Sequence, residues 1–163
     1  MLIAIMSDSH DHISRIKQAL ALLAERGVST VIHAGDFVAP FALAPFVEAN
    51  VKLYAVFGNN DGEIRGLRQK AEPIGGIQAG PYRFELEGKR FLVNHAPLSD
   101  DRIATERHRT DYVICGHTHV AEHRRAGGLT LINPGELCGW LKGRPTFVIL
   151  DVASGKCEFV ELQ

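Results

Sequence analysis

Residues 2–10, Leu-Ile-Ala-Ile-Met-Ser-Asp-Ser-His, decide how this chain begins to fold: an apolar run ends abruptly in polar, chemically reactive residues. The run from Leu2 to Met6 is short and rich in isoleucine, so it predicts a buried strand. From Ile13 onward, apolar side chains recur at helical spacing as far as Gly27, a typical helix stop. The chain therefore begins with a strand, a polar loop and a covering helix.

The same order of strand, polar loop and helix recurs along the next part of the chain. It predicts strands at 30–34 and 52–57, a short helix within 40–49 and a polar helix over 63–70. Such alternation indicates a parallel α/β sheet, because parallel strands need a covering crossover. The second half is rich in β-structure, and we expect two packed sheets with helices outside. Its predicted strands are 77–79, 82–86, 90–94, 112–115, 129–132, 146–152 and 158–162.

Length and composition favour one cytoplasmic domain, residues 1–163. The chain is 45% hydrophobic, and its 18 basic and 19 acidic residues are spread along it without a basic run that would bind a nucleic acid. The three cysteines form no Cys-x-x-Cys pair, so neither a disulfide framework nor a thiolate zinc site is indicated. The apolar start is too short for a signal peptide or a membrane span. We expect neither a membrane nor a nucleic-acid partner.

Histidine, aspartate and asparagine side chains follow five of the predicted strands. Loops after the carboxyl ends of strands commonly carry the functional residues of α/β folds. Imidazole and carboxylate groups suit Mn, Fe, Co, Ni or Zn, and this set exceeds what one ion normally takes. Two ions sharing Asp36 as the bridging ligand are the economical interpretation. The candidate ligands are Asp8, His10, Asp36, Asn59, His95, His117 and His119.

Three glycines stand directly before candidate ligands: Gly35, Gly58 and Gly116. Without a side chain, the backbone can turn sharply there and approach an ion closely. Ordinary turn roles are the alternative interpretation.

The motifs, in their order along the chain, resemble those of the calcineurin-like metallophosphoesterase superfamily. The resemblance spans nearly the whole chain. The length of the chain and its Asn133-Pro134-Gly135 segment are similar to those of the small YfcE-type phosphodiesterases. It implies a two-sheet β-sandwich flanked by helices in four layers, with a dinuclear centre at the strand ends. The matching motifs are Asp8-Ser9-His10, Gly35-Asp36, Gly58-Asn59-Asn60-Asp61, Asn94-His95 and Gly116-His117-Thr118-His119.

The resemblance also implies a distribution of ligands and a reaction. Phosphorus would be attacked in line by a hydroxide between the ions, because metal binding lowers the pKa of water toward neutrality. Manganese is the metal first expected, although Ni, Fe, Co and Zn suit the same ligands. Carried over by position, one ion would take Asp8, His10, Asp36 and His119, and the other Asp36, Asn59, His95 and His117.

The expected activity is hydrolysis of a phosphate ester, with a diester favoured over a monoester. Asp36, Asn59 and Asn60 are the candidate catalytic residues. The natural substrate is not visible in the motifs, and a homodimer stays open.

Two positions depart from the family pattern. Asn60 stands where members have histidine or, in the small phosphodiesterases, cysteine, and asparagine cannot act as a general acid. It can still donate a hydrogen bond to phosphate, so we expect a preference for leaving groups that need little protonation, such as phenolates. Ala96-Pro97 replaces the glycine and histidine that usually follow the ligand His95.

A phosphoesterase-like scaffold of weak activity, comparable with the retromer subunit of that fold, is the alternative function. The intact set of ligand-type residues favours an enzyme. A metal-dependent amide hydrolase is disfavoured, because its barrel takes about 250 residues. His12, His33, His108 and His123 have no ligand role by the resemblance. A solvated loop is expected for His12, and a role as the replacement acid is the alternative. Core packing is expected for Cys115, and a pocket rim or packing for Cys138 and Trp140.

Overall fold

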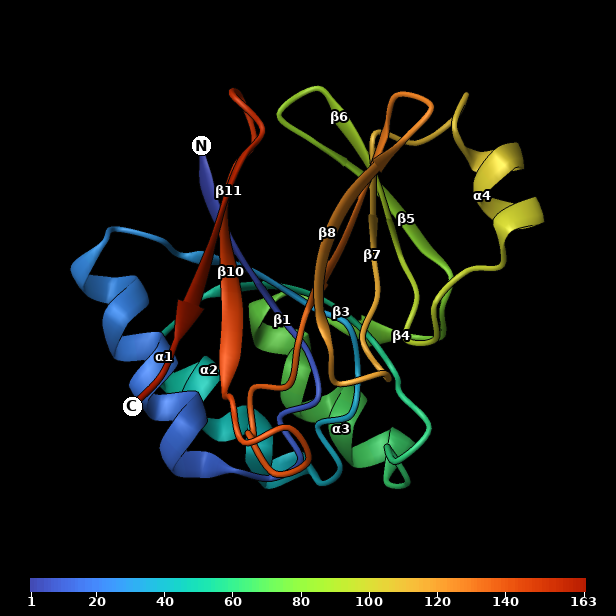
Figure 1. Cartoon of the computed structure of the whole chain (residues 1–163). Helices are drawn as coiled ribbons and strands as arrows, with labels where there is room; N and C mark the ends of the chain where they lie inside the picture. Colours follow the sequence, from blue (N-terminus) through green and yellow to red (C-terminus); the bar gives the residue numbers. More distant parts are fainter.

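Two β-sheets lie face to face in the computed structural model, which describes residues 1–163 (Figure 1). In the first sheet β1 to β4 run parallel, because helical crossovers connect β1 to β2, β2 to β3 and β3 to β4. The last two strands of the chain add to its β1 edge in antiparallel fashion. In spatial order the strands are β11 (Lys156–Glu161), β10 (Thr146–Asp151), β1 (Leu2–Met6), β2 (Thr30–His33), β3 (Lys52–Val56) and β4 (Ile77–Gln78).

The second sheet has a parallel centre and antiparallel edges. β6, β7 and β9 are parallel, whereas β5 and β8 return to them through tight hairpins. In spatial order the strands are β5 (Tyr82–Leu86), β6 (Lys89–Val93), β7 (Tyr112–Ile114), β9 (Leu129–Pro134) and β8 (Ala121–Ala126).

Helices cover the outer face of each sheet. A buried apolar cluster joins the first sheet to its helices, and a second cluster, with Ile5 and Ile114 among its members, fills the space between the sheets. A smaller cluster lies beneath α4, on the second sheet. None of the helices is long and apolar enough to cross a membrane. The helices are α1 (Ile13–Glu25), α2 (Ala44–Glu48), α3 (Ile64–Ala71) and α4 (Asp100–Glu106), with short 3₁₀ turns at Pro40–Leu43 and Glu72–Ile74.

The predicted fold of two packed sheets with outer helices is confirmed, and its helix and strand boundaries lie within a few residues of those expected. Two elements were absent from the prediction. β8 is an edge strand with mostly exposed polar side chains, so it has no apolar alternation to reveal it. The signal that was available is Gly127-Gly128, whose positive φ angles of 57° and 91° suit the two-residue hairpin turn to β9. The short helix α4 was also missed.

Candidate metal centre

Loops from both sheets meet at the end of the molecule where the parallel strands terminate (Figure 1). Leu137, after β9, donates a backbone hydrogen bond to the carbonyl oxygen of Ser7, after β1, at 3.0 Å. This arrangement is what places residues far apart in sequence side by side. The structure brings together all seven candidate ligands: Asp8, His10, Asp36, Asn59, His95, His117 and His119.

Asp8 lies at the centre of one half of the site and is fully buried. Its Oδ2 accepts a backbone hydrogen bond from His117 at 3.0 Å, whereas its Oδ1 has no hydrogen-bond partner. That Oδ1 lies 3.3 Å from His119 Nε2 and 3.8 Å from His10 Nε2. Burial raises the pKa of the Asp8 carboxyl, although the neighbouring Ser7 hydroxyl and the His119 imidazole act in the opposite direction.

Asp36 links this half of the site to the other. Its Oδ2 lies 3.6 Å from His10 Nε2 and 3.4 Å from His95 Nε2. The backbone N–H and the side-chain amide of Asn60 donate to the two Asp36 oxygens at 2.9 and 2.8 Å. Burial opposes ionisation of Asp36, yet the adjacent His95 side chain and the hydrogen bonds from Asn60 outweigh it and hold its pKa well below the usual value. Asp36 is therefore a carboxylate that faces both halves.

Asn59 completes the second half. Its Oδ1 lies 2.9 Å from His95 Nε2 and 2.8 Å from His117 Nδ1. His95 Nδ1 donates to the carbonyl oxygen of Ala34 at 2.8 Å, so in the neutral ring Nε2 carries the lone pair. The altered sequence after His95 has therefore left this side chain aimed at Asp36 and Asn59.

Unpaired acceptor atoms make the site fit a cation. Asp8 Oδ1 and His10 Nε2 are buried and have no hydrogen-bond partner, which is costly in a protein interior. Oxygen and imidazole nitrogen atoms converge there, and ligand atoms of Asp8, Asp36 and His95 lie within 4.8 Å of one another. A divalent transition-metal ion takes this set of donors and would complete the coordination of atoms that the chain itself leaves unpaired.

The backbone at the site is held in an uncommon conformation. Positive φ angles are rare for residues other than glycine and cost on the order of 1 kcal/mol or more each. Such strain is typical of functional sites, where the surrounding structure enforces it. The candidate ligands with positive φ are Asp8 (52°), His10 (41°), Asp36 (62°), His117 (67°) and His119 (60°).

The three glycines before ligands are required for close packing against the ligand side chains. A Cβ atom on Gly58 would collide with the Asp36 carboxylate, and one on Gly116 would collide with the Ser7 hydroxyl. Of the three glycines, Gly35 has a positive φ, at 103°. Gly58 and Gly116 therefore permit close packing of protein atoms, while close approach of the backbone to an ion stays a prediction.

Glu136 is a site residue that the sequence analysis missed. Its carboxylate is fully buried after β9 and accepts a hydrogen bond from His119 Nδ1 at 2.7 Å. It also accepts the backbone N–H groups of Leu141 and Lys142. Hydrogen bonds to Lys142, His119 and Leu141 lower its pKa against the opposing and larger single effect of burial. Glu136 therefore fixes the His119 ring so that Nε2 faces Asp8, a common support for metal-ligating histidine.

Asp61 and Asn133 hold the loops together and were quoted in the motifs without a role. Asp61 accepts the backbone N–H groups of Asp36 at 3.0 Å and Gly58 at 2.7 Å, which joins the loops after β2 and β3. Asn133 donates to the carbonyl oxygen of Gly116 at 2.9 Å and positions the loop after β7. The sequence does show an acid or amide beside each strand-end motif. It does not show which backbone groups these side chains bind.

A pocket of about 180 Å³ opens over the site, and its lining includes His10, Asn60 and His119. Trp140 and Cys138 line it too, which confirms the rim position considered for them. The Trp140 ring stacks near His10, with centroids 6.2 Å apart. Burial raises the pKa of the Cys138 thiol to about 11, so it is protonated at neutral pH.

The remaining histidines lie outside the cluster of ligand atoms. His33 is fully buried against Phe37 and lies 3.2 Å from the Ser9 hydroxyl, and burial lowers its pKa to about 3. It is a neutral structural residue. His12 occupies the N-cap position of α1 without a side-chain capping hydrogen bond and contacts the Ser14 hydroxyl, with its ring 5.5 Å from that of Trp140.

Comparison with known proteins identifies the family. A model of the calcineurin-like phosphoesterase superfamily domain matches residues 1–155. The chain is 38% identical over 154 residues to the phosphodiesterase MJ0936 of Methanocaldococcus jannaschii, and the match covers 93% of each protein.

Solved structures agree with this assignment. The structure of an archaeal phosphodiesterase superposes with a TM-score of 0.91 at 35% identity, over 99% of this chain and 100% of that one. The structure of the Escherichia coli phosphoesterase Yfce superposes with a TM-score of 0.71 at 19% identity over the whole of both chains, which shows the shared fold. The resemblance inferred from the motifs is confirmed: this chain belongs to the calcineurin-like phosphoesterase superfamily.

Proposed function

We propose that this protein is a metal-dependent phosphodiesterase and that residues 1–163 form a single catalytic domain. The observation that carries the proposal is the convergence of unpaired Asp8 Oδ1 and His10 Nε2 with the Asp36 carboxylate, beneath an open pocket. The chain's similarity to a phosphodiesterase over nearly its full length supports the choice of a diester substrate.

Each ion would be held by one half of the site, and Asp36 would be shared. Its carboxylate lies within 3.6 Å of imidazole nitrogens from both halves, which supports a bridging role. Such a pair of ions supplies positive charge for the phosphoryl oxygens and a water of lowered pKa as the nucleophile. One set is Asp8, His10, Asp36 and His119, and the other is Asp36, Asn59, His95 and His117.

Side chains of the protein orient the candidate ligands and limit which leaving groups can depart. Glu136 holds His119 and the loop at Leu141 and Lys142, so the histidine and the pocket rim are positioned together. Asn60 donates to Asp36, and a substrate phosphate would have to share this amide. Because Asn60 has no acidic proton, we expect good leaving groups to be favoured, and Asn60→His to improve turnover of alkyl esters.

Manganese is the metal we propose first, since carboxylate and imidazole ligands suit it and availability often decides occupancy. We also propose a cytoplasmic location, because a reducing compartment agrees with the free cysteines, and we leave a homodimer as a further proposal.

The test is turnover of bis(4-nitrophenyl) phosphate by metal-stripped protein re-supplied with Mn, Fe, Co, Ni or Zn in turn. We expect no activity without metal, recovery with at least one ion, and no recovery in Asp36→Ala. Full activity of both the stripped protein and Asp36→Ala would contradict the proposal. Metal binding without any turnover would favour the scaffold.

A further inference from the structure

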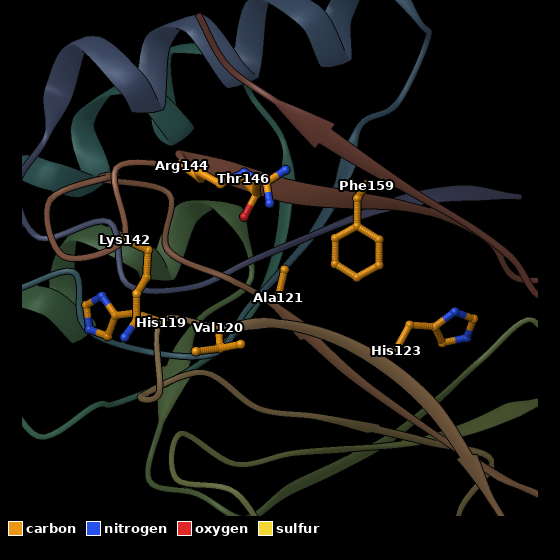
Figure 2. Close-up of a pocket in the computed structure, with 8 residues that line it drawn as sticks. All are labelled: His119, Val120, Ala121, His123, Lys142, Arg144, Thr146 and Phe159. Atoms are coloured by element: carbon orange, nitrogen blue, oxygen red, sulfur yellow. The ribbon is translucent and has the colours of Figure 1, made fainter.

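A groove beside the metal centre is not used by the proposed chemistry. It has a volume of about 450 Å³, within the range of about 300–1,000 Å³ typical of small-molecule sites. Figure 2 shows that it begins at His119 and Lys142 and extends past Val120 to Phe159 and His123. His119 lines both this groove and the pocket over the metal centre. The groove therefore adjoins the pocket over the candidate metal centre at His119.

Two basic side chains line the groove: Lys142 lies beside His119 at the metal-centre end, and Arg144 lies beside Thr146 (Figure 2). None of the residues that line the groove is acidic. Arg144 binds Glu161 through Nε and Nη2, at 3.1 and 2.7 Å, which leaves Nη1 without a protein partner. Lys142 forms no ion pair with the chain. An anionic group next to the reacting phosphorus would meet these two cations.

The far end of the groove is suited to a flat ring. Phe159 is 38% exposed, and its ring projects from β11 toward β8, across the open edge between the two sheets (Figure 2). His123, on β8, lies at the same end (Figure 2). Aromatic side chains of this kind stack on nucleobases without strong preference among them.

The order of these features indicates the class of substrate. Resting on the proposed phosphodiesterase function, we propose that the groove binds the nucleoside monophosphate half of a substrate that contains a P–O–P bond. The second phosphate lies at Lys142 and Arg144, and the base lies at Phe159 and His123. Reaction adds water to the phosphorus at the centre and breaks its bond to the bridging oxygen. The nucleoside monophosphate leaves with the electron pair, and the protons of the water are released as the products ionise.

Asn60 agrees with such a substrate. A phosphate leaving group departs without being protonated, whereas the alkoxide of an ordinary alkyl diester needs a general acid. Such a substrate therefore accounts both for the two cations of the groove and for the missing acid.

The test compares two dinucleosides that differ only in the second phosphate, diadenosine 5′,5′-diphosphate and diadenosine 5′,5′-monophosphate, with manganese-loaded protein. We expect kcat/KM for the diphosphate to exceed that for the monophosphate diester by about 100-fold or more, and Lys142→Gln to reduce this ratio about tenfold. Phe159→Thr should raise KM for the diphosphate about fivefold. Lys17→Gln, an exposed lysine on α1, is the matched control and should change neither value.

Failure of the inference can be told from failure of the proposed function. Turnover of bis(4-nitrophenyl) phosphate with equal kcat/KM for the two dinucleosides, or a ratio unaffected by Lys142→Gln, would overturn the inference alone. If the protein hydrolysed no ester, the binding of adenosine 5′-monophosphate would test the inference by itself. Trp140 is the only tryptophan and lines the adjoining pocket, so its fluorescence reports adenosine 5′-monophosphate binding to metal-free protein. We expect the Kd for adenosine 5′-monophosphate to rise about tenfold in Lys142→Gln. An unchanged Kd would refute the proposal that the groove binds a nucleoside monophosphate.

Discussion

Two regions of the molecule bury acidic side chains, and they treat them differently. Glu106, at the end of α4, is 3% exposed and accepts two hydrogen bonds from the Arg83 guanidinium, at 2.6 and 2.8 Å. Thr110 donates a third, at 3.2 Å. At the metal centre, Asp8 is buried even more completely, yet one of its oxygens has no donor. The chain provides a cation for Glu106 and leaves room for an external one beside Asp8.

This comparison separates stability from function. A buried carboxylate with its own guanidinium partner stabilises the fold, because removing either group leaves the other unpaired. A buried carboxylate that faces imidazole lone pairs lowers the stability of the metal-free protein, and a bound cation offsets that loss. Substitutions in the two regions should therefore have opposite consequences.

The largest expected effect is that of Asp36→Asn on turnover. The substitution keeps the size of the side chain but removes the charge that faces both halves of the site. We expect kcat for bis(4-nitrophenyl) phosphate to fall about 1,000-fold or more. The same assay on Glu106→Gln is the control, and a comparable loss there would remove the distinction between the two regions.

Glu136→Gln should have a smaller effect on the same reaction. The amide can still contact His119, but it no longer offers a charged acceptor to Nδ1–H. We expect a loss of about 10- to 100-fold in metal affinity or activity, measured by titrating activity against manganese. Wild-type affinity in the variant would show that Glu136 supports only the loop at Leu141 and Lys142.

The stability of the metal-free protein should distinguish Asp8→Asn from Glu106→Gln. Asp8→Asn removes an uncompensated buried charge, so we expect the free energy of unfolding at pH 7 to rise by about 1 kcal/mol. Glu106→Gln should lower it by on the order of 1 kcal/mol, because Arg83 is 44% exposed and its charge is partly screened. Urea unfolding in the presence of a chelator measures both. A decrease in both variants would contradict the account of Asp8.

The smallest expected effect is the pH dependence of the Glu106 contribution. Hydrogen bonding to Arg83 lowers the pKa of Glu106 below its usual 4.5 despite burial. A lowered folded-state pKa stabilises the protein above the unfolded-state pKa, and that stabilisation disappears as the pH falls through the folded-state value. The difference in unfolding free energy between wild type and Glu106→Gln should thus be full at pH 7 and shrink below pH 4.5. If the difference in unfolding free energy between the two proteins grew as the pH fell, the pKa of Glu106 would be raised by folding and not lowered.

The parallel core and the ligand cluster were predictable because they depend on local patterns. Each central strand is a short apolar run, and the polar residues after it must emerge at the carboxyl edge of a parallel sheet. Asp36 was chosen as the shared ligand because it lies between the other candidate ligands in chain order. The geometry then showed it within 3.6 Å of His10 and His95.

The features that escaped prediction depend on tertiary contacts. Glu136 is an ordinary glutamate in the sequence, and only the folded chain buries it against His119. Edge strand β8 has exposed polar side chains on both faces, so its existence depends on pairing with β9. The groove was invisible for the same reason, since Lys142 and Phe159 come from separate segments of the chain.

The most direct test of the two-ion centre is the metal content of protein that has been loaded with manganese and freed of excess by gel filtration. Elemental analysis should give two ions per chain for wild type and for Glu106→Gln, and one or fewer for Asp36→Asn. A single ion in wild type, or two ions retained by Asp36→Asn, would contradict a centre in which Asp36 joins both halves.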